Sequence, residues 1–336
     1  MAFIDRILPA PVNGGFHMDD YWVWCGSVIQ GEDDRYHMFA ARWPKHLPFF
    51  DGYKVASEVV HAVADTPEGP YQFQSVVLPD RGPDFWDGRM THNPTIHRYG
   101  DQYLLFYIGA TYPEPRPSEQ ELRDKTTRVP NQCYQTIRIG YAVADSVWGP
   151  WQRPAAPCLD IRPGKWDGSI VTNPAPCVRP DGSILLYYRS NTPKGLRLGC
   201  TCAATLGAPF ERLSDEPVLT FSGDEFVEDP YVWHNGEHYE LIAKDIHGGI
   251  CGEVHAGIHA HSADGIAWTL CEPPKAYSRT IYWDNGTVTN QGCVERPQLL
   301  IQDGVPTHLF AATGDGPGGF RNCDKSWNLV TPLGGS

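Results

Sequence analysis

The segment from Val227 to Leu270 contains the stretch that decides the fold. Residues Val227–Asp245 have the sequence VEDPYVWHNGEHYELIAKD, and Ile258–Leu270 have the sequence IHAHSADGIAWTL. Each contains short runs rich in β-branched and aromatic residues in which apolar and polar side chains alternate, and the runs are bounded by Asn-Gly or Asp-Gly. Alternation with a period of two and turns of this chemistry are typical of antiparallel strands. This stretch therefore predicts a unit of strand, turn, strand, loop and strand.

The same unit occurs five times along the sequence, which is its most informative feature. Equivalent points in the middle strand are spaced 55 to 81 residues apart. They are Tyr36, Tyr103, Ile184, Tyr239 and His308.

A Pro-containing segment precedes the middle strand in the last four units, and a strand with a small-residue signature follows it in the first four. The Pro segments are MTHNPTIHR from Met90, VTNPAPCVR from Val171, VEDPYVWHN from Val227 and VERPQLLIQ from Val294. The first unit, WCGSVIQGE from Trp24, keeps the spacing but lacks the proline. The third strands include HAVADTPEGPYQF from His61 and YAVADSVWGPWQR from Tyr141, and the fifth unit has only the degenerate SWNLVTPL from Ser326.

Five repeats of antiparallel strands predict an all-β fold, a five-bladed β-propeller with four-stranded blades around a central pocket. A fourth strand fits the residues left over between units, as in SVVLP from Ser75. We expect residues 1–336 to form a single domain, with a strand around Phe3–Leu8 completing the short last blade. A β-sandwich also has many short strands, but it would not explain the layered repeat.

The composition agrees with a globular all-β protein and excludes several classes of partner. The 41% hydrophobic content is enough for a sizeable core, and 34 Gly with 30 Pro are too dense for long helices. With 40 acidic and 27 basic residues, the net charge of −13 would repel a phosphate backbone and an anionic bilayer. We therefore expect neither nucleic acid nor a membrane as a partner.

The N-terminal sequence MAFIDRILPAPVNGG has no basic segment followed by an apolar one, and no run of 18 apolar residues occurs anywhere. These features predict a cytoplasmic protein, or a periplasmic or secreted one if a leader has been removed. The ten cysteines are irregularly spaced and are interpreted as mostly buried free thiols.

The acidic-Pro segments VEDP and VERP and the third strands of the form A-x-A-D-x-x-x-G-P-aromatic resemble the propeller glycoside hydrolases of families 32, 43 and 117, with family 117 the nearest. The resemblance spans nearly the whole sequence. It implies an exo-acting glycoside hydrolase that removes a terminal sugar from a plant- or algal-type oligosaccharide, with inversion. Two other functions remain open: a carbohydrate-binding propeller without catalysis, and a polysaccharide lyase acting on a uronate.

The innermost strands of a propeller converge on the axis, so the residues at their starting ends should surround one pocket. Each of the five units offers a polar or acidic pair at this position, where carboxylates are unfavourable unless they are paired or functional. The pairs are Asp19 and Asp20, His92 and Asn93, Thr172 and Asn173, Glu228 and Asp229, and Glu295 and Arg296.

Glycoside hydrolysis needs one protonated and one ionised carboxyl group. The resemblance implies a general base in the first blade, which we place at Asp20 with Asp19 as the alternative. It also implies that Asp229 tunes the acid and holds sugar hydroxyls. For the general acid, Glu295 is available in VERP, and the resemblance to family 117 implies a histidine, for which His247 is the candidate. His92, Asn93, Asn173, Glu228 and Arg296 are expected to bind the substrate.

The last residues of the second strands should face the same rim. Arg42, Arg189 and Lys244 are basic there, which suits an anionic sugar. The alternative is that they neutralise the rim carboxylates. Trp24 is a candidate for stacking on the sugar.

No cofactor or catalytic metal is predicted, although a structural cation with a histidine ligand in the central channel is left open. Two weaker groups, Cys200 with Cys202 and the histidines 255, 259 and 261, lack the partner set of a closed zinc site. The oligomeric state is also left open.

Overall fold

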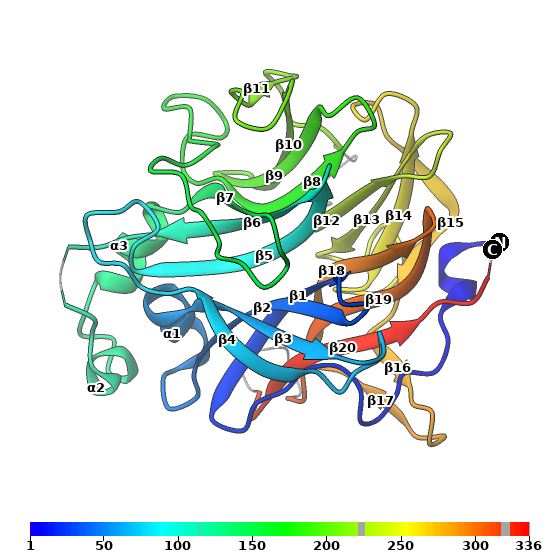
Figure 1. The fold of residues 1–336 in the computed structure, drawn as a ribbon, viewed down its shortest axis with the longest axis horizontal. Helices are drawn as coiled ribbons and strands as arrows, with labels where there is room; N and C mark the ends of the chain where they lie inside the picture. Colours follow the sequence, from blue (N-terminus) through cyan, green and yellow to red (C-terminus); the bar gives the residue numbers. More distant parts are fainter. Residues whose placement is uncertain (114, 221–225, 317–322, 336) are drawn as a thin grey trace.

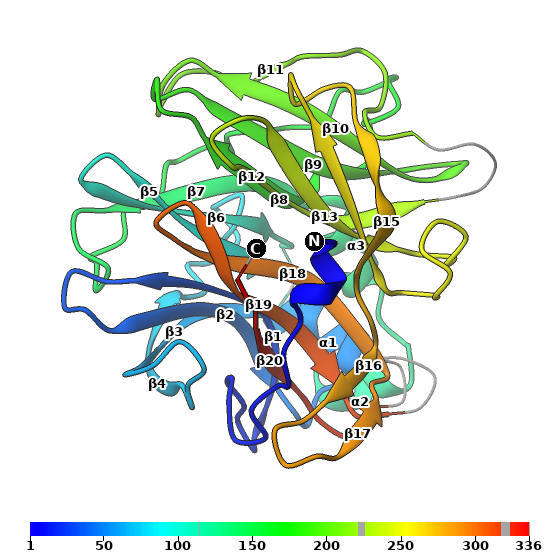
Figure 2. The same cartoon turned by 90° about the vertical axis from the view of Figure 1, so that its right-hand side faces the viewer.

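A computed structural model describes residues 1–113, 115–220, 226–316 and 323–335. Five antiparallel sheets stand around a central axis (Figures 1 and 2). The predicted all-β, five-bladed propeller is confirmed.

Each blade follows the predicted order, with its first strand innermost. Blade 1 comprises β1 (Tyr21–Gln30), β2 (Tyr36–Pro44), β3 (Glu58–Ala64) and β4 (Gln72–Leu78). Blade 2 comprises β5 (Met90–Tyr99), β6 (Gln102–Ala110) and β7 (Arg138–Ala144). Blade 3 comprises β8 (Thr172–Val178), β9 (Ile184–Thr192), β10 (Gly195–Ala203) and β11 (Glu211–Arg212). Blade 4 comprises β12 (Val227–His234), β13 (Tyr239–Asp245), β14 (Gly257–Ser262) and β15 (Thr269–Tyr277). Blade 5 comprises β18 (Cys293–Gln302), β19 (Val305–Gly314) and β20 (Ser326–Pro332), and a small hairpin of β16 (Thr280–Tyr282) and β17 (Val288–Asn290) precedes it.

The N-terminal segment lies along the outer edge of blade 5, but it is not the strand expected around Phe3–Leu8. Phe3–Arg6 form a 3₁₀ helix, η1, and the segment then makes isolated bridges, Ile7 with Leu333 just after β20 and Phe16 with Asn328 of β20. The apolar side chain of Phe3 is buried against Trp233 and His259 of blade 4, which a strand on β20 would not reach. The two ends of the protein lie side by side in Figures 1 and 2.

The five innermost strands form a closed ring, because β1 contacts β5, β5 contacts β8, β8 contacts β12, β12 contacts β18 and β18 contacts β1. Each of them contains a β-bulge whose first residue has a left-handed backbone with φ between 52° and 56°. These residues are Cys25, Asn93, Asn173, Asp229 and Arg296. Asn and Asp tolerate this conformation better than most residues.

The bulges explain the Pro segments of the sequence, because a proline follows the left-handed residue in four blades. Proline has no N–H to give to a ladder, and a bulge interrupts the ladder at this point. Blade 1 has Gly26 instead, and its N–H donates to Asn328 Oδ1 at 2.6 Å. Because Gly26 has an N–H where the other blades have a proline, blade 1 donates a hydrogen bond to blade 5 at this point.

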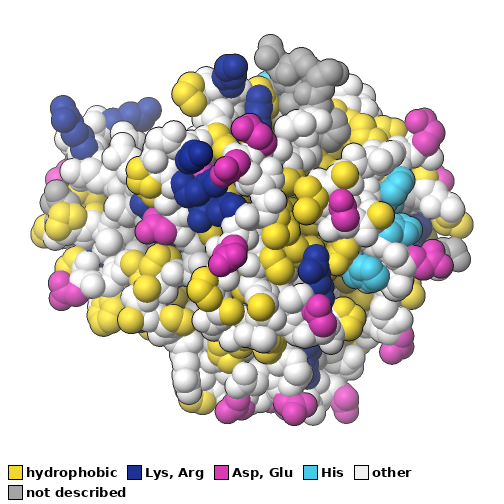
Figure 3. Space-filling view, turned by 90° about the horizontal axis from the view of Figure 1, so that it is seen from above, with side chains coloured by type: hydrophobic (Ala, Val, Ile, Leu, Met, Phe, Trp, Pro, Cys, Tyr) yellow, Lys and Arg dark blue, Asp and Glu magenta, His cyan; other side chains and the backbone are white. Residues whose placement is uncertain are grey.

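Three short helices lie in the connections of blades 1 and 2. They are α1 (Phe49–Ala56), α2 (Glu119–Arg123) and α3 (Val129–Gln135), and α1 packs on α3. Within the described ranges, no helix has the length and hydropathy needed to cross a bilayer. On the face drawn in Figure 3, charged side chains of both signs are scattered, and histidine side chains gather in one area.

Candidate active site

A pocket of about 220 Å³ opens at the bulged ends of the inner strands, on the propeller axis. Its polar lining residues come from blades 2 to 5, and its aromatic lining residues, apart from His92, come from blade 1 and the helices α1 and α3. Its lining includes Trp24, Trp43, Phe49, Phe50, Tyr53, His92, Asn93, Tyr134, Thr172, Asn173, Arg189, Glu228, Asp229, Lys244, Glu295 and Arg296.

The five bulge residues form a hydrogen-bonded belt across the blades below this pocket. The Cys25 thiol donates to Asn93 Oδ1 at 2.8 Å, and Asn93 Nδ2 donates to Asn173 Oδ1 at 2.9 Å. Asn173 Nδ2 donates to Asp229 Oδ1 at 2.6 Å, and the backbone N–H of Arg296 donates to Asp229 Oδ2 at 3.0 Å. Both oxygens of Asp229 are therefore used in holding adjacent blades together.

The residues immediately before the bulges form a second ring that faces the pocket: Trp24, His92, Thr172, Glu228 and Glu295. Their partners on the second strands are Ala41, Ile108, Arg189, Lys244 and Ala312. Blades 3, 4 and 5 thus supply the charged side chains, while blade 1 supplies an aromatic ring.

The Lys244 ammonium lies among three carboxyl groups. Lys244 Nζ is 2.9 Å from Glu228 Oε2, 2.7 Å from Glu295 Oε2 and 3.7 Å from Asp229 Oδ2. Arg189 Nε adds a contact of 3.3 Å to Glu228 Oε1. Glu228 therefore contacts two cations, whereas Glu295 contacts one.

This difference separates the pKa values of the two glutamates. Burial raises the pKa of Glu295 to about 7; Lys244 opposes the rise, and the carboxylates of Asp229 and Glu228 add to it. Burial also acts against ionisation of Glu228, but Lys244 and Arg189 outweigh it and lower its pKa to about 2. Near neutral pH the pocket thus contains one ionised glutamate and one that is partly protonated.

Glu295 also has an oxygen available for a ligand. Its Oε2 accepts from Lys244, whereas the buried Oε1 has no hydrogen-bond partner among the described residues. A buried polar atom of this kind costs free energy unless a bound group satisfies it.

His92 on blade 2 is held as a neutral ring. Its Nδ1 lies 2.8 Å from Ser57 Oγ, and its ring stacks on Tyr53 with centroids 5.0 Å apart. Burial, followed by the nearby charge of Arg296, lowers its pKa to about 3. The imidazole can position a sugar hydroxyl but carries no charge near neutral pH.

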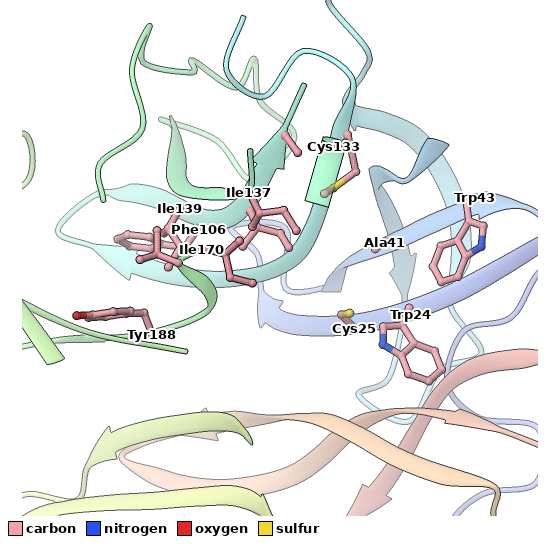
Figure 4. Close-up of a cluster of buried hydrophobic side chains, with 14 of the residues drawn as sticks. Trp24, Cys25, Ala41, Trp43, Phe106, Cys133, Ile137, Ile139, Ile170 and Tyr188 are labelled. Carbon is pink, nitrogen blue, oxygen red and sulfur yellow. The ribbon is translucent and has the colours of Figure 1, made fainter. Parts of the chain in front are cut away.

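The aromatic wall is built around Phe49 of α1. Trp22, Trp24 and Trp43 contact the Phe49 ring edge-on, with centroids 5.0 to 5.2 Å apart. Figure 4 shows Trp24 and Trp43 on neighbouring strands of blade 1, together with the apolar residues that continue the core toward blade 3. This side of the pocket presents aromatic faces and edges to a ligand.

Most of the predicted site residues meet at this pocket. The structure brings together Trp24, His92, Asn93, Asn173, Arg189, Glu228, Asp229, Lys244, Glu295 and Arg296.

Asp19 and Asp20 do not reach the pocket. Both are exposed in the turn before β1; the side chain of Asp19 is 94% exposed and contacts His17 at 3.2 Å. The bulge residue of blade 1 is Cys25, five residues and up to about 16 Å of strand beyond Asp20. Placing the pair at the rim was therefore wrong.

Arg42 and His247 also lie elsewhere. Val23 pairs with Arg42 in blade 1, whereas the pocket-facing pair is Trp24 with Ala41. A shift of one residue turns a side chain to the other face of a sheet. Arg42 consequently contacts Glu58 at 2.9 Å and packs between Tyr21 and Phe73. His247 is exposed in the turn after β13 and packs on Phe226.

Four aromatic pocket residues on helices were not predicted from the sequence: Phe49, Phe50, Tyr53 and Tyr134. They lie on α1 and α3, which interrupt the strand repeat. The signal that could have found them is the aromatic cluster FFDGY within the long connection between β2 and β3. Tyr134 accepts from Arg189 Nη2 at 3.3 Å, so it also belongs to the charged network.

The cation left open for the central channel has three candidate ligands. Oxygen atoms of Glu228, Asp229 and Glu295 all lie within 4.8 Å of one another, a spacing that could hold a metal ion. The Lys244 ammonium already contacts all three carboxylates. A metal ion here would have to compete with that ammonium.

No protein-family model matches the sequence, and no curated protein matches it either. Solved structures do match its fold. BT0996, solved as an RGII complex, has a TM-score of 0.68 at 15% identity, with 98% of the present protein and 94% of that structure covered. A family 117 glycoside hydrolase from the marine bacterium Zobellia galactanivorans has a TM-score of 0.64 at 15% identity, with 98% and 89% covered. A family 43 β-xylosidase/α-arabinofuranosidase from a compost microbial metagenome, in complex with xylotriose, has a TM-score of 0.63 at 15% identity, with 98% and 96% covered. The fold implied by the resemblance to families 43 and 117 is therefore shared with solved members of both.

Proposed function

We propose that the protein is a glycoside hydrolase that releases one terminal, uncharged sugar residue from an oligosaccharide with retention of anomeric configuration. Glu228 is the nucleophile and Glu295 is the acid and base. The observation that carries the proposal is the pair of neighbouring glutamates, one with a pKa of about 2 and one with a pKa of about 7. Glycoside hydrolases among the solved structures of the same fold support it.

The close approach of a carboxyl oxygen of Glu228 to one of Glu295 favours retention over the inversion that the resemblance implies. Retaining enzymes place their two carboxyl groups about 5–5.5 Å apart, whereas inverting enzymes leave about 6.5–9.5 Å for a water. Oxygen atoms of Glu228 and Glu295 lie within 4.8 Å of each other. Asp20, the base considered for inversion, lies outside the pocket.

The reaction then takes two steps. In the first, protonated Glu295 gives its proton to the glycosidic oxygen while Glu228 attacks the anomeric carbon, so the leaving group departs as an alcohol. In the second, ionised Glu295 takes a proton from water, and that water displaces Glu228 from the anomeric carbon. Every group needed comes from the protein itself, so we propose no cofactor.

The size and charge of the pocket support an exo-acting enzyme on a neutral sugar. At about 220 Å³ the pocket is smaller than the roughly 300–1,000 Å³ of sites for drug-sized ligands. Arg189, Lys244 and Arg296 each contact a pocket carboxylate, at 3.3, 2.7 and 3.7 Å for the nearest approach. The three basic groups are thus largely neutralised within the site.

A panel of aryl glycosides and oligosaccharides, assayed with wild type, Glu228→Gln and Glu295→Gln, tests the proposal. Loss of the acid should lower kcat by about 10²–10⁴-fold on a sugar with a poor leaving group. It should lower kcat/KM far less on a dinitrophenyl glycoside, whose leaving group needs no proton, although kcat falls because the second step still needs the base; Glu228→Gln should abolish turnover of both. Glu211→Gln, an exposed carboxylate on β11, is the control. Binding without turnover by the wild type would indicate a carbohydrate-binding protein, and an unsaturated product would indicate a lyase.

A further inference from the structure

The outer strands of blade 4 gather five side chains with metal-binding atoms, well away from the axial pocket. His238 precedes β13 and Glu240 lies on it, His259 and His261 lie on β14, and Cys271 lies on β15. Glu240 pairs with His261 across the two strands, so these residues share one face of the sheet. None of the five lines the axial pocket.

The ligand atoms converge. His259 Nε2 is 2.7 Å from Glu240 Oε2, and His238 Nε2 is 2.9 Å from Glu240 Oε1. Cys271 Sγ is 3.6 Å from His261 Nδ1. One ligand atom from each of Glu240, His259 and Cys271 lies within 4.8 Å of the other two. Among the residues that the structure describes, only the three pocket carboxylates form another group of this kind.

Two of these atoms are buried with only each other as a close partner. Glu240 Oε2 and His259 Nε2 lie 2.7 Å apart, and neither makes a hydrogen bond to any further group in the described part of the protein. Two buried lone-pair donors directed at one place are the arrangement that a metal ion satisfies.

The surroundings hold the groups in position. Asn235 Nδ2 donates to Glu240 Oε1 at 2.9 Å. The His259 ring stacks on Trp233, with an interplanar angle of 4°, and packs against Phe3 of the N-terminal 3₁₀ helix. Metal ligands in proteins are usually held in orientation by contacts of this kind with residues that do not themselves bind the metal.

We propose that Glu240, His259 and Cys271 bind a zinc ion that ties β13, β14 and β15 together at the outer edge of blade 4. Thiolate, imidazole and carboxylate are the ligands that zinc takes in proteins, and a tetrahedral site leaves one position for water or for the imidazole of His261 or His238. The role is structural, and it is independent of the glycosidase proposal.

Calorimetric titration of the full-length protein with Zn²⁺ tests the proposal, and Co²⁺ serves as a spectroscopic probe. We expect one Zn²⁺ per molecule and a thiolate-to-cobalt charge-transfer band that Cys271→Ser removes. Cys271→Ser and His259→Gln should each weaken Zn²⁺ binding at least 10-fold and abolish the rise in Tm that Zn²⁺ produces in the wild type.

Cys202→Ser, at another half-buried strand cysteine, is the matched control and should change neither readout. The Cys271→Ser variant keeps the test valid if His259→Gln fails to fold. Absence of Zn²⁺ uptake by the wild type would overturn the proposal, as would equal binding by wild type and Cys271→Ser.

Discussion

At the scale of single residues, the chemistry of the pocket depends on the contacts that the Lys244 ammonium makes with Glu228 and Glu295. The ammonium contacts Glu228 and Glu295 at nearly equal distances, but only Glu228 has a second cation, Arg189. That additional charge keeps one glutamate ionised and leaves the other with a pKa of about 7. Two side chains of the same type thereby acquire different roles at one pH.

The first prediction is a pH profile. Glu295 must be protonated to donate to the leaving oxygen, so kcat/KM should be constant below pH 7 and fall as the pH rises through about 7. No acidic limb is expected until the pH approaches the pKa of Glu228, about 2, or the protein unfolds. With a dinitrophenyl glycoside, Glu295→Gln should lose the alkaline limb. An unchanged alkaline limb in that variant would assign the titration to another group.

The second prediction concerns Arg189. Besides Glu228, its guanidinium contacts Asn191 Oδ1 at 2.8 Å and the Tyr134 hydroxyl at 3.3 Å, so it acts within the protein network. Arg189→Met should lower kcat/KM by about 10-fold or more, the loss of one charged hydrogen bond, and by the same factor on a neutral sugar and its carboxylated analogue. Selective loss on the carboxylated analogue would show instead that the guanidinium binds an anionic substrate.

At the scale of elements, the sequence Trp-Asp-Gly occurs twice, at residues 86–88 and 166–168, and its role is structural. Asp87 is fully buried, accepts from the Tyr107 hydroxyl at 2.7 Å and contacts Arg81 and Arg153, while Trp86 stacks on Tyr107. The second copy repeats these contacts in blade 3, with Asp167, Tyr188, Arg162, Arg212 and Trp166. The motif therefore fixes the loops before the inner strands of blades 2 and 3.

The third prediction concerns the junction of blades 1 and 5. Asn328 on β20 is fully buried, and its side chain accepts from the N–H of Gly26 in the blade 1 bulge. Asn328→Ala would leave that N–H without a partner and should lower the free energy of unfolding by about 1–3 kcal/mol. Urea denaturation measures the change. Asn131→Ala, on an exposed face of α3, should stay within about 0.5 kcal/mol of the wild type. An equal effect of the two substitutions would mean that this contact does not hold the ring closed.

At the scale of the whole molecule, the sequence predicts the architecture well because the repeat consists of local signals. Strand alternation and turn residues recur in one order, and the Pro segments mark the bulges, so the axis and ten of the pocket residues follow.

The errors arise where the signal is not local. Arg42 lies one residue beyond Ala41, the partner of the pocket-facing Trp24. The alternation of side chains alone does not fix the register of a strand to a single residue. The resemblance implies an aspartate in blade 1, but the bulge position of that blade holds Cys25, and Asp20 lies in the turn before β1. The aromatic wall comes from helices inserted between strands, where the repeat gives no information.

The net charge of −13 belongs to the protein as a whole, whereas the charged groups inside the pocket neutralise one another. Arg189, Lys244 and Arg296 are buried where three inner strands meet, beside the three carboxyl groups that they neutralise. A neutral sugar would enter such a pocket without the desolvation of a further charge.

Trapping of the glycosyl-enzyme tests the central claim, that Glu228 and Glu295 act as a retaining pair, most directly. The full-length protein carrying Glu295→Gln would be incubated with a dinitrophenyl glycoside that the wild type hydrolyses, and then analysed by mass spectrometry before and after proteolysis. Because formation of the intermediate needs no acid and its hydrolysis needs a base, the account predicts an added mass of one glycosyl residue on the peptide containing Glu228. Absence of any adduct, together with release of the inverted anomer by the wild type, would contradict it.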